Sequence, residues 1–477
     1  MKESEKNGCP QRRACGGCQL QNMSYAEQLL HKQKREVSLL GRFGHVEEIM
    51  GMDEPLHYRN KVHAAFGLDR NRRVVSGIYQ PGSHAIVPVD ECMIEDELAD
   101  KIIVSIRKLL PEFKIQVYDE RSGSGWLRHV LVRRGFATGQ VMVVLVAVSP
   151  MFKLQKPFLT KLLSLHPEIN TVVLNINDRF GPVVLGRRDK VIYGEGTIED
   201  ILCGKRYRIS PSSFYQINPV QTEKLYSAAV EFAGLTGKET VLDAYCGIGT
   251  IGLTASDRAK QVIGVELNGD AVKDAIVNAR LNGVKNCWFT QGDAGRYMEQ
   301  MVADGHRCDV VFMDPPRSGS DERFIGSLLK AGPKRIVYIS CNPETLARDL
   351  DLICQGGYRV RRIQPVDMFP FTNHIETVVQ LVRKKPDTYI DITVDMDELD
   401  LTSSEAKATY DEIKDYIFDK YRVKVSSLYI AQVKQKHGII ERDCYNNSKK
   451  DNPKQPQCPP EKVKLIEEAL RHFKMIP

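Results

Sequence analysis

The stretch Val241-Leu242-Asp243-Ala244-Tyr245-Cys246-Gly247-Ile248-Gly249-Thr250 combines an apolar run, a glycine turn and the start of a helical pattern. The apolar run predicts a buried strand, and the glycines leave room for a ligand against the backbone. Glu266 ends the next predicted strand, nineteen residues after Gly247. About 20 residues after such a turn, an acidic side chain is placed to bind the hydroxyl pair of a ribose. The stretch therefore predicts a nucleotide-binding βαβ unit, with a purely structural βαβ unit as the alternative.

Strand and helix signals alternate around this unit, from about residue 210 to residue 385. Asn218 and Pro219 supply a cap and a first helical residue for a helix that continues to about Phe232. The later runs are residues 241–245, 251–255, 262–266, 271–281, 310–313, 324–329, 335–339 and 346–354. This alternation predicts an α/β domain, residues 210–385, with a doubly wound Rossmann-like sheet and right-handed crossovers.

Further carboxylates extend the predicted ligand site. The turn matches the Gly-x-Gly-x-x-Gly dinucleotide pattern only formally, and Asp243 at the strand end favours S-adenosylmethionine over NAD. Asp293, after Thr290-Gln291-Gly292, is placed to bind the adenine amino group. Asp314 opens Asp314-Pro315-Pro316-Arg317, whose prolines stiffen a loop that can turn the carboxylate to cofactor and substrate together. A rigid loop with an ordinary surface aspartate is the alternative.

Ile339-Ser340-Cys341-Asn342-Pro343 places a cysteine where an open α/β sheet keeps its chemistry. Residues 335–339 read as a buried strand, and Pro343 suits the first turn of a following helix. Cys341 would then lie at a helix N-terminus, where the dipole and free N–H groups favour the nucleophilic thiolate. A small buried thiol is the alternative, and a nucleophile needs a partner base and a cofactor.

Cysteines are densest at the start of the chain, in Cys9-x5-Cys15-Gly16-Gly17-Cys18. Three thiols beside flexible glycines suit a metal centre, and Cys92 is the next cysteine that can supply a fourth ligand. Such a set binds either a [4Fe-4S] cluster or tetrahedral zinc, and the spacing alone does not separate them. The five residues between the first pair argue against the Cys-x3-Cys-x2-Cys pattern of radical enzymes. Chance clustering of free thiols is the alternative.

Residues 58–209 change to short alternating runs, which predict a mostly antiparallel β domain. The predicted strands include residues 74–79, 115–118, 130–132 and 172–176, and one helix lies near residues 154–165. Within this domain, residues 121–134 carry basic and aromatic side chains without a carboxylate: Arg121, Arg128, Arg133, Arg134, Trp126 and His129. This combination suits contact with phosphates and stacking on bases, and a solvated strand face is an equal alternative.

The two ends of the chain read as smaller segments. Ser24 and Glu27 predict a capping box that opens an amphipathic helix to about Leu40, so residues 1–57 form a cysteine segment with a helix. Residues 386–477 begin with an acidic stretch over 387–400. Helical patterns follow at 403–421, up to 437, and at 461–475, with a polar linker at 446–460. They predict a small helical C-terminal extension.

Length and composition set outer bounds. A chain of 477 residues exceeds one hydrophobic core, and a net charge of +6 permits a nucleic-acid partner without requiring one. Twelve cysteines point to metal binding or catalysis rather than disulfides. The longest apolar run has eight residues, against ~20 for a membrane-spanning helix, and residues 1–20 lack an apolar signal core. We expect a cytoplasmic protein without a membrane partner.

Together the motifs resemble the RNA uracil-C5 methyltransferase family, which makes 5-methyluridine, and above all its 23S ribosomal RNA branch. The resemblance covers about residues 9–383 and is carried by the cysteine motif, Ser213-Phe214-Tyr215-Gln216-Ile217-Asn218, residues 243–247, 314–317 and 340–343, and His374-Ile375-Glu376. It implies an S-adenosylmethionine site formed by Gln216, Tyr245, Glu266, Asp293 and Asp314. It also implies a [4Fe-4S] cluster on Cys9, Cys15, Cys18 and Cys92. Cys341 would be the nucleophile and Glu376 the base of a monomeric enzyme whose partner is 23S ribosomal RNA, with no protein partner.

The implied chemistry needs both residues. Thiolate addition at C6 makes C5 of uracil electron-rich enough to accept a methyl group, and a base must then remove the C5 proton. A carboxylate at the mouth of a strand over residues 375–382 is the structural alternative for Glu376. Three rival functions remain: the same chemistry on transfer RNA, amino-group methylation of RNA or DNA through Asp314, and a non-enzymatic iron-sulfur protein that binds RNA or carries electrons. The mechanism requires Cys341, Glu376 and the cofactor pocket to meet in one cleft.

Overall fold

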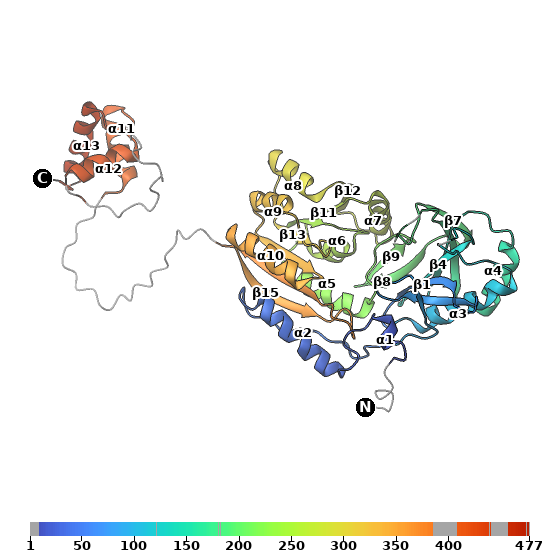
Figure 1. The fold of residues 1–477 in the computed structure, drawn as a ribbon. Helices are drawn as coiled ribbons and strands as arrows, with labels where there is room; N and C mark the ends of the chain where they lie inside the picture. Colours follow the sequence, from blue (N-terminus) through green and yellow to red (C-terminus); the bar gives the residue numbers. More distant parts are fainter. Residues whose placement is uncertain are drawn as a thin grey trace. The chain divides into compact units, whose positions relative to one another are not determined.

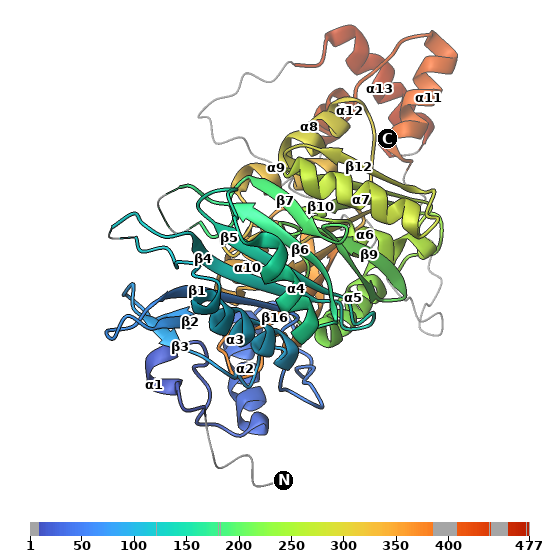
Figure 2. The same cartoon turned by 90° about the vertical axis from the view of Figure 1, so that its right-hand side faces the viewer.

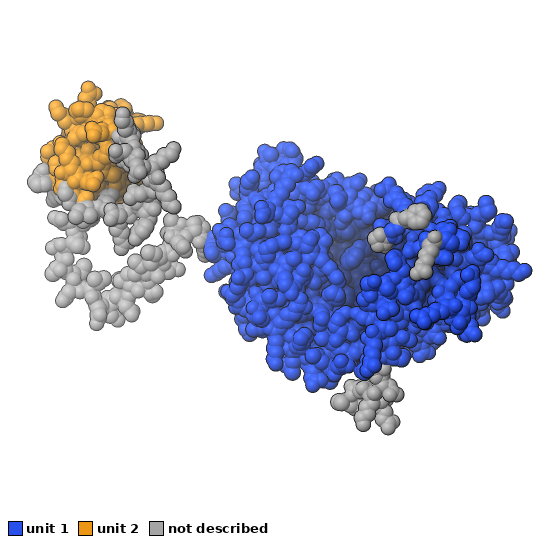
Figure 3. Space-filling model, viewed as in Figure 1, with its two compact units in different colours: residues 1–386 blue, residues 387–477 orange. Residues whose placement is uncertain are grey.

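The computed structural model describes residues 9–120, 122–179, 181, 183–384, 408–437, 439, 457–473 and 475–476. The chain forms two compact units, Met1–Pro386 and Asp387–Pro477 (Figures 1 and 3). The finer division of the first unit into residues 1–57, 58–209 and 210–385 stays a prediction. Arg121 and the acidic stretch 387–400 lie outside the described residues, as does the start of the helix predicted from residue 403.

A seven-stranded sheet in the order β12-β11-β10-β13-β14-β16-β15 organises the later part of the first unit. Its strands are β10 (Thr240–Ala244), β11 (Gln261–Glu266), β12 (Cys287–Gln291), β13 (Val310–Met313), β14 (Arg335–Ser340), β15 (Tyr358–Val366) and β16 (Glu376–Arg383). Strands β10 to β14 pair in parallel, whereas β16 is antiparallel to both β14 and β15. The order reverses between β10 and β13, which is where an open α/β sheet binds its ligand.

Helices cover both faces of this sheet (Figure 1). The helices are α5 (Pro219–Ala233), α6 (Thr250–Ala255), α7 (Gly269–Leu281), α8 (Ala294–Ala303), α9 (Glu322–Ala331) and α10 (Pro343–Gln355). Val241 packs in one core with α5, α6 and α7, and its neighbour Leu242 packs in a second core with α8, α9 and α10. Successive residues of a strand point to opposite faces, so the apolar run Val241–Leu242 requires a covered sheet on both sides. The doubly wound architecture is confirmed.

The sequence patterns missed two strands of the sheet. β12 at one edge is a short and half-exposed strand, and β15 at the other edge carries Arg359, Arg361 and Arg362. The Arg362 guanidinium lies 4.3 Å above the Phe232 ring and pairs with Glu47 at 2.7 Å. Edge strands tolerate charge because one side is open, which removes the apolar signal that identifies inner strands.

A second seven-stranded sheet, β3-β2-β1-β4-β5-β6-β7, precedes the first (Figure 2). Its strands are β1 (Lys61–Leu68), β2 (Val74–Tyr79), β3 (Ile86–Pro88), β4 (Leu127–Arg134), β5 (Val141–Ala147), β6 (Ile169–Ile176) and β7 (Arg188–Tyr193), and β8 (Ile198–Leu202) and β9 (Lys205–Ile209) form a separate hairpin. Every neighbouring pair is antiparallel except β5 and β6, as the alternating runs predict. Helices α3 (Glu97–Glu112) and α4 (Gln155–Leu165) pack on one face.

One predicted strand in this region is wrong. Residues 115–118 contribute only an isolated bridge between Val117 and Leu127. The Gln116 carbonyl accepts hydrogen bonds from the N–H groups of both Trp126 and Leu127, at 2.9 and 3.2 Å. Two successive N–H groups on one facing carbonyl are the pattern of a β-bulge, which interrupts a regular ladder.

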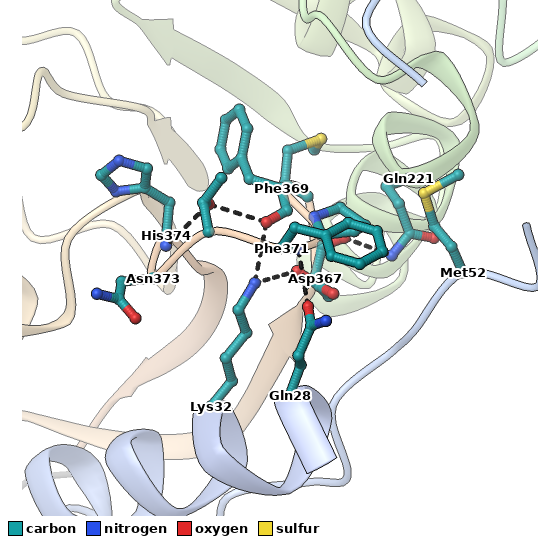
Figure 4. A network of polar contacts seen from close by, with 12 residues as sticks. Gln28, Lys32, Met52, Gln221, Asp367, Phe369, Phe371, Asn373 and His374 are labelled. Atoms are coloured by element: carbon teal, nitrogen blue, oxygen red, sulfur yellow. Dashed lines mark hydrogen bonds and ion pairs between the residues drawn. The ribbon is translucent and has the colours of Figure 1, made fainter. Parts of the chain in front are cut away.

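Helix α2 (Tyr25–Leu40) begins with the predicted capping box of Ser24 and Glu27. Its buried residues, four apart along the helix, are mostly polar: Gln28, Lys32, Glu36 and Leu40. Lys32 pairs with Asp367 at 2.5 Å and donates to the Phe369 carbonyl at 3.0 Å, and Gln28 accepts from the Phe371 N–H at 2.8 Å (Figure 4). The helix therefore holds the loop between β15 and β16, although some 340 residues separate them in the chain.

Replacing Lys32 by methionine is expected to destabilise the protein strongly. The side chains of Lys32 and Asp367 are 1% and 0% exposed, so the variant leaves a buried carboxylate without its cation. Removing one partner of a buried ion pair costs about 3–5 kcal/mol. Chemical denaturation should show this loss in the free energy of unfolding, whereas Lys34→Met, at an exposed position of α2, should change it by less than about 0.5 kcal/mol. Equal stability of the two variants would contradict the structural role of the pair.

The second unit contains three helices among its described residues, α11 (Tyr410–Tyr421), α12 (Ser427–Lys436) and α13 (Pro460–His472). Ile413, Ile417, Ile430, Ile466 and Leu470 form its own apolar core. The helical character of the C-terminal extension is thus as predicted. No helix in the described parts of either unit has the length and apolar content needed to cross a bilayer.

Candidate active site

The antiparallel pairing of β14 and β16 places Cys341 next to Glu376. Ser340, the last residue of β14, lies opposite Thr377, and Glu376 is the first residue of β16. Cys341 follows Ser340, so one more step in the same register brings it to Glu376. β14 ends where β16 begins, so the two predicted catalytic residues lie at the same end of this strand pair, beyond the carboxyl end of β14.

A cavity of about 200 Å³ opens at this end of the strands, and segments from four parts of the first unit line it. Its lining residues are Arg35, Arg317, Cys341, Asn342, Pro343, Glu344, Asn373, His374 and Ile375. The Asn342 side chain donates to the Arg317 carbonyl at 3.1 Å, which ties the Asp314–Arg317 loop to the cysteine turn. Arg35 of α2 donates to the Asn373 carbonyl at 2.9 Å and so holds the opposite wall.

The Cys341 thiol is less acidic than its position suggests. Helix α10 begins as predicted, with Pro343 in its first turn and Asn342 as its cap. Burial, followed by the Glu376 and Asp314 carboxylates, nevertheless raises the pKa of Cys341 to about 11, against an opposing effect of Arg317. Desolvation and the two acidic neighbours thus oppose the thiolate that the helix N-terminus is expected to favour.

The two carboxyl groups beside Cys341 also hold their protons tightly. Burial raises the pKa of Asp314 to about 7. Burial, Asp314 and Glu36 raise the pKa of Glu376 well above its usual value, whereas Arg317 lowers it. Asp314 also raises the pKa of both Cys341 and Glu376, as an acidic group does to close neighbours in a poorly solvated site. Cys341, Glu376 and Asp314 thus share one site with Arg317.

The glycine turn after β10 forms a cradle for a ligand. Tyr245 and Gly247 have φ values of +71° and +54°, and Gly249 caps helix α6. A Cβ atom added to Gly247 would meet nothing within 4 Å, so the space beside this backbone is open. The Glu266 carboxylate accepts hydrogen bonds from the N–H groups of Gly247 at 3.1 Å and Asn268 at 2.8 Å. These bonds hold Glu266 at the rim of the open turn.

Asp243 supports the turn from below. Its Oδ2 accepts from the Gly252 N–H at 2.8 Å, and its buried Oδ1 has no partner among the described residues. Burial raises the pKa of Asp243 to about 8. A Cβ atom on Gly252 would lie 2.9 Å from Oδ2, so a glycine is required for this close approach.

Of the remaining predicted cofactor residues, Tyr245 follows the carboxyl end of β10 and Asp293 that of β12. Asp293 follows β12 and caps α8 by accepting from the Arg296 N–H at 2.9 Å. The Tyr245 hydroxyl hydrogen-bonds to Ser320 at 3.2 Å, and Asp293 is close enough to contribute to the raised pKa of Tyr245. Gln216 is buried, and its carbonyl accepts from the Asn60 side chain at 3.0 Å.

The four cysteines predicted to bind metal lie in the N-terminal part of the unit. Cys9 precedes the short helix α1 (Arg12–Cys15) and Cys15 is its last residue, whereas Cys18 and Cys92 pack against one small cluster of Met52, Tyr58 and Ile94. Among the described residues, no group of three or more Cys, His, Asp or Glu side chains is arranged to hold a metal ion. The described part of the chain thus does not show the predicted metal centre.

The basic segment of the central sheet has a different role from either prediction. Arg128 and Arg133 are buried, and both donate to backbone carbonyls, Arg128 to Arg179 at 2.5 Å and Arg133 to Ser213 at 2.5 Å. They are therefore neither a solvated face nor a free phosphate-binding pair. Arg134 pairs with Asp96 at 2.8 Å. The predictions failed because β4 is an inner strand whose charged residues brace neighbouring loops.

Sequence patterns missed a row of donors on the same sheet. In the register of β1 and β4, Lys61 lies opposite Arg133 and Ala65 opposite His129, which places these side chains on one face. Burial, Arg133 and Arg59 lower the pKa of Lys61 to about 8, and no carboxylate in the described residues pairs with it. The His63 and His129 rings, 4.9 Å apart, each keep one buried nitrogen without a partner. Strand alternation in Lys61-Val62-His63 is the sequence signal that predicts this face.

Comparison with known proteins agrees with this geometry. Residues 24–384 match the model of a family described as tRNA (Uracil-5-)-methyltransferase. The chain is 46% identical over 381 residues to an uncharacterized RNA methyltransferase of Halalkalibacterium halodurans, which covers 79% of this chain and 83% of that protein. It is 43% identical over 382 residues to another from Clostridium acetobutylicum, with the same shares of 79% and 83%.

A solved structure shares the fold. The tRNA (uracil-54, C5)-methyltransferase of Pyrococcus abyssi, in complex with S-adenosyl-L-homocysteine, superimposes with a TM-score of 0.65 at 29% identity. The match covers 77% of this chain and 86% of that one. By family model, relatives and fold, the chain belongs to the tRNA (uracil-5-)-methyltransferase family and is an S-adenosylmethionine-dependent RNA methyltransferase of class I fold.

Proposed function

We propose that this enzyme methylates C5 of uridine in 23S ribosomal RNA through a covalent bond between Cys341 and C6. The supporting observation is the meeting of Cys341 and Glu376 at one edge of the sheet, beside Asp314. The choice of ribosomal RNA follows the resemblance of the motifs to that branch of the family. Transfer RNA is the alternative substrate, because the Pyrococcus abyssi enzyme acts on transfer RNA by its name.

The residues around the glycine turn fit S-adenosylmethionine. We assign its ribose to Glu266, which stands at the open space beside Gly247, and its adenine to Asp293. Gln216, Tyr245 and Asp314 complete the assigned set. When bound, the cofactor supplies a methyl group on a positively charged sulfur, which C5 accepts as the neutral thioether departs.

Cys341 begins the reaction by forming a bond from sulfur to C6. The thiol gives up its proton, and the electron pair of the C5–C6 double bond moves onto C5 and O4, where it makes C5 nucleophilic. After C5 carries both its hydrogen and the methyl group, Glu376 takes the C5 proton. The electron pair of that C–H bond restores the double bond and expels the Cys341 thiolate, which regains a proton from solvent in place of the one it gave up to solvent, so the net release is the one proton from C5.

Arg317 is the charge partner of both anions in this sequence. It favours the ionised forms of Cys341 and Glu376, against the burial that disfavours them. A base with a raised pKa is stronger once ionised, which suits the removal of a carbon-bound proton. Because burial and its acidic neighbours raise the pKa of Glu376, a larger share of this base is ionised as the pH rises, and the rate should rise with pH.

The row of donors on the central sheet supports an RNA substrate. Lys61 has no carboxylate partner among the described residues, which suits contact with a phosphate oxygen. A uridine has to leave its stack to reach Cys341, so contacts on both sides of the target are required. We place the enzyme in the cytoplasm, acting as a monomer on RNA.

RNA that contains 5-fluorouridine tests this function directly. Fluorine at C5 cannot leave as a proton, so the methylated adduct should stay on Cys341 and survive denaturation, where a peptide map locates it. An amino-group methyltransferase acting through Asp314 would methylate the RNA without an adduct. A non-enzymatic iron-sulfur protein would do neither. Methylation without an adduct would therefore contradict the proposed covalent mechanism.

We further propose that Cys9, Cys15, Cys18 and Cys92 hold a [4Fe-4S] cluster. The supporting observations are that Cys9 acts electrostatically on both Cys15 and Cys18, and that Cys18 and Cys92 contact one apolar cluster. Protein purified without oxygen is expected to be brown, with a broad visible absorbance that Cys15→Ser and Cys92→Ser remove, whereas Cys458→Ser keeps it. Colourless protein that contains zinc would show that the four cysteines bind zinc instead of the cluster. Protein that contains neither metal would contradict a metal site.

A further inference from the structure

Glu36 is a buried carboxyl group that the catalytic scheme has not used. It belongs to the polar stripe of α2 and is 0% exposed. Its Oε2 accepts a hydrogen bond from the Thr377 hydroxyl at 2.9 Å, and its Oε1 has no partner in the described residues. Burial without full pairing is costly for a carboxyl group, so its presence calls for a compensating role.

Thr377 links Glu36 to the catalytic base Glu376. Thr377 directly follows Glu376 in β16 and lies opposite Ser340, the residue before Cys341. The bond from Glu36 therefore holds the strand pair at the point where Cys341 and Glu376 meet. Glu36 also acts on Glu376 through space, where it opposes ionisation, as Asp314 does.

We propose, on the basis of the proposed function, that Glu36 is a positioning residue that anchors Thr377 and places a second negative charge behind Glu376, which makes this base stronger. A carboxylate surrounded by other carboxylates binds a proton more tightly, and the removal of a carbon-bound proton benefits from that strength. Lys32 and Gln28 on the same face of α2 hold the preceding loop, so the helix serves the base in two ways (Figure 4).

The charged groups around this pair set the direction of its effect. The charges that shift the pKa of Glu376 are those of Asp314, Arg317 and Glu36. The charges that shift the pKa of Glu36 are those of Arg35 and Glu344. Cys341 lies beside Glu376, and Lys32, one turn before Glu36, is paired with Asp367. Burial raises the pKa of Glu36 to about 7, so above neutrality it is an anion next to Glu376. Removing this anion lowers the pKa of Glu376.

Glu36→Gln tests the inference, because glutamine keeps the shape and can still accept from Thr377. The acid limb of the pH profile for methyl transfer should move to lower pH by about one unit. On its plateau the rate should fall about threefold and the steady-state fraction of covalent RNA–protein complex should rise about threefold, since a weaker base delays release of Cys341. Binding of S-adenosylmethionine should stay unchanged. Thr377→Val, which removes a donor that favours the Glu36 anion, should shift the limb in the same direction by less.

Asp351→Asn is the matched control, since Asp351 of α10 also forms an ion pair across this region, with Arg42 just after α2 at 2.5 Å, but in solvent. It should leave the pH profile at that of the unmodified enzyme. Superimposed profiles for Glu36→Gln, Thr377→Val and the control would overturn the inference, as would an equal loss of cofactor binding in both variants. Failure of the proposed function is distinguishable, because then the unmodified enzyme itself forms no adduct with 5-fluorouridine RNA.

Discussion

Replacement of Cys341 by alanine is expected to abolish methylation of RNA while cofactor binding persists. In the proposed mechanism the covalent bond to C6 makes C5 nucleophilic, so without sulfur the remaining residues can only position the reactants. Removing a nucleophile from a site of this kind lowers turnover by about 10⁴-fold or more. Transfer of a labelled methyl group to RNA measures the turnover, and calorimetric titration with S-adenosylmethionine measures the binding.

Cys354→Ala is the matched control for this variant. Cys354 lies on α10, the helix that Cys341 precedes, and packs against the core away from the cavity. It should keep nearly full activity and should still form the adduct with 5-fluorouridine RNA. Methylation by Cys341→Ala at more than about 1% of the original rate would show that the thiol is not the nucleophile.

The thiol should also show a characteristic pH dependence before any substrate binds. A pKa of about 11 means that the resting Cys341 is protonated at neutral pH. Its alkylation by iodoacetamide should therefore accelerate about tenfold for each pH unit between pH 7 and pH 10. Glu376→Gln should lower that pKa, because it removes the acidic neighbour with the larger effect on Cys341.

Glu376→Gln is expected to stop the reaction one step later. The variant can still form the bond to C6 and accept the methyl group at C5, but no carboxylate removes the C5 proton. Loss of a positioned general base lowers turnover by about 10²–10⁴-fold. A methylated, covalent RNA–protein complex should therefore accumulate on ordinary uridine RNA and appear as a slowly migrating band under denaturing electrophoresis.

The carboxyl group of Glu344 provides the comparison for this trapping. Glu344 lines the same cavity but pairs with Arg35 at 2.5 Å and lies in the first turn of α10. Glu344→Gln should not accumulate the complex. If Glu376→Gln lost turnover without accumulating any complex, the base would act before methyl transfer, and the assigned order of steps would be wrong.

Local patterns predicted the elements that need only short stretches of chain. The apolar runs of β10, β11, β13 and β14 are buried on both faces and contain the signal of an inner strand. Asn218, Asn342 and Ser24 each cap the helix that their sequence predicts. The edge strands β12 and β15 escaped prediction because an open edge relaxes the demand for apolar residues.

Electrostatic properties were the least predictable from sequence. The position of Cys341 before a helix suggested a thiolate, but its pKa depends on Glu376 and Asp314, which lie on other elements. Likewise Arg128 and Arg133 seemed available to a nucleic acid, but both are buried against carbonyl groups. Burial changes the energy of a charge by several kcal/mol, and burial is a property of the packed chain.

Periodicity and spacing within about 20 residues are enough to predict the doubly wound sheet, its glycine turn and the residues placed at the ends of its strands. Only the tertiary structure decided that Cys341 and Glu376 share a site, since the antiparallel insertion of β16 beside β14 sets their register. It also decided that α2 supports that site through Lys32 and Glu36, whose partners lie more than 330 residues later in the chain. Contacts between distant segments depend on the packing of the whole sheet, which no local pattern contains.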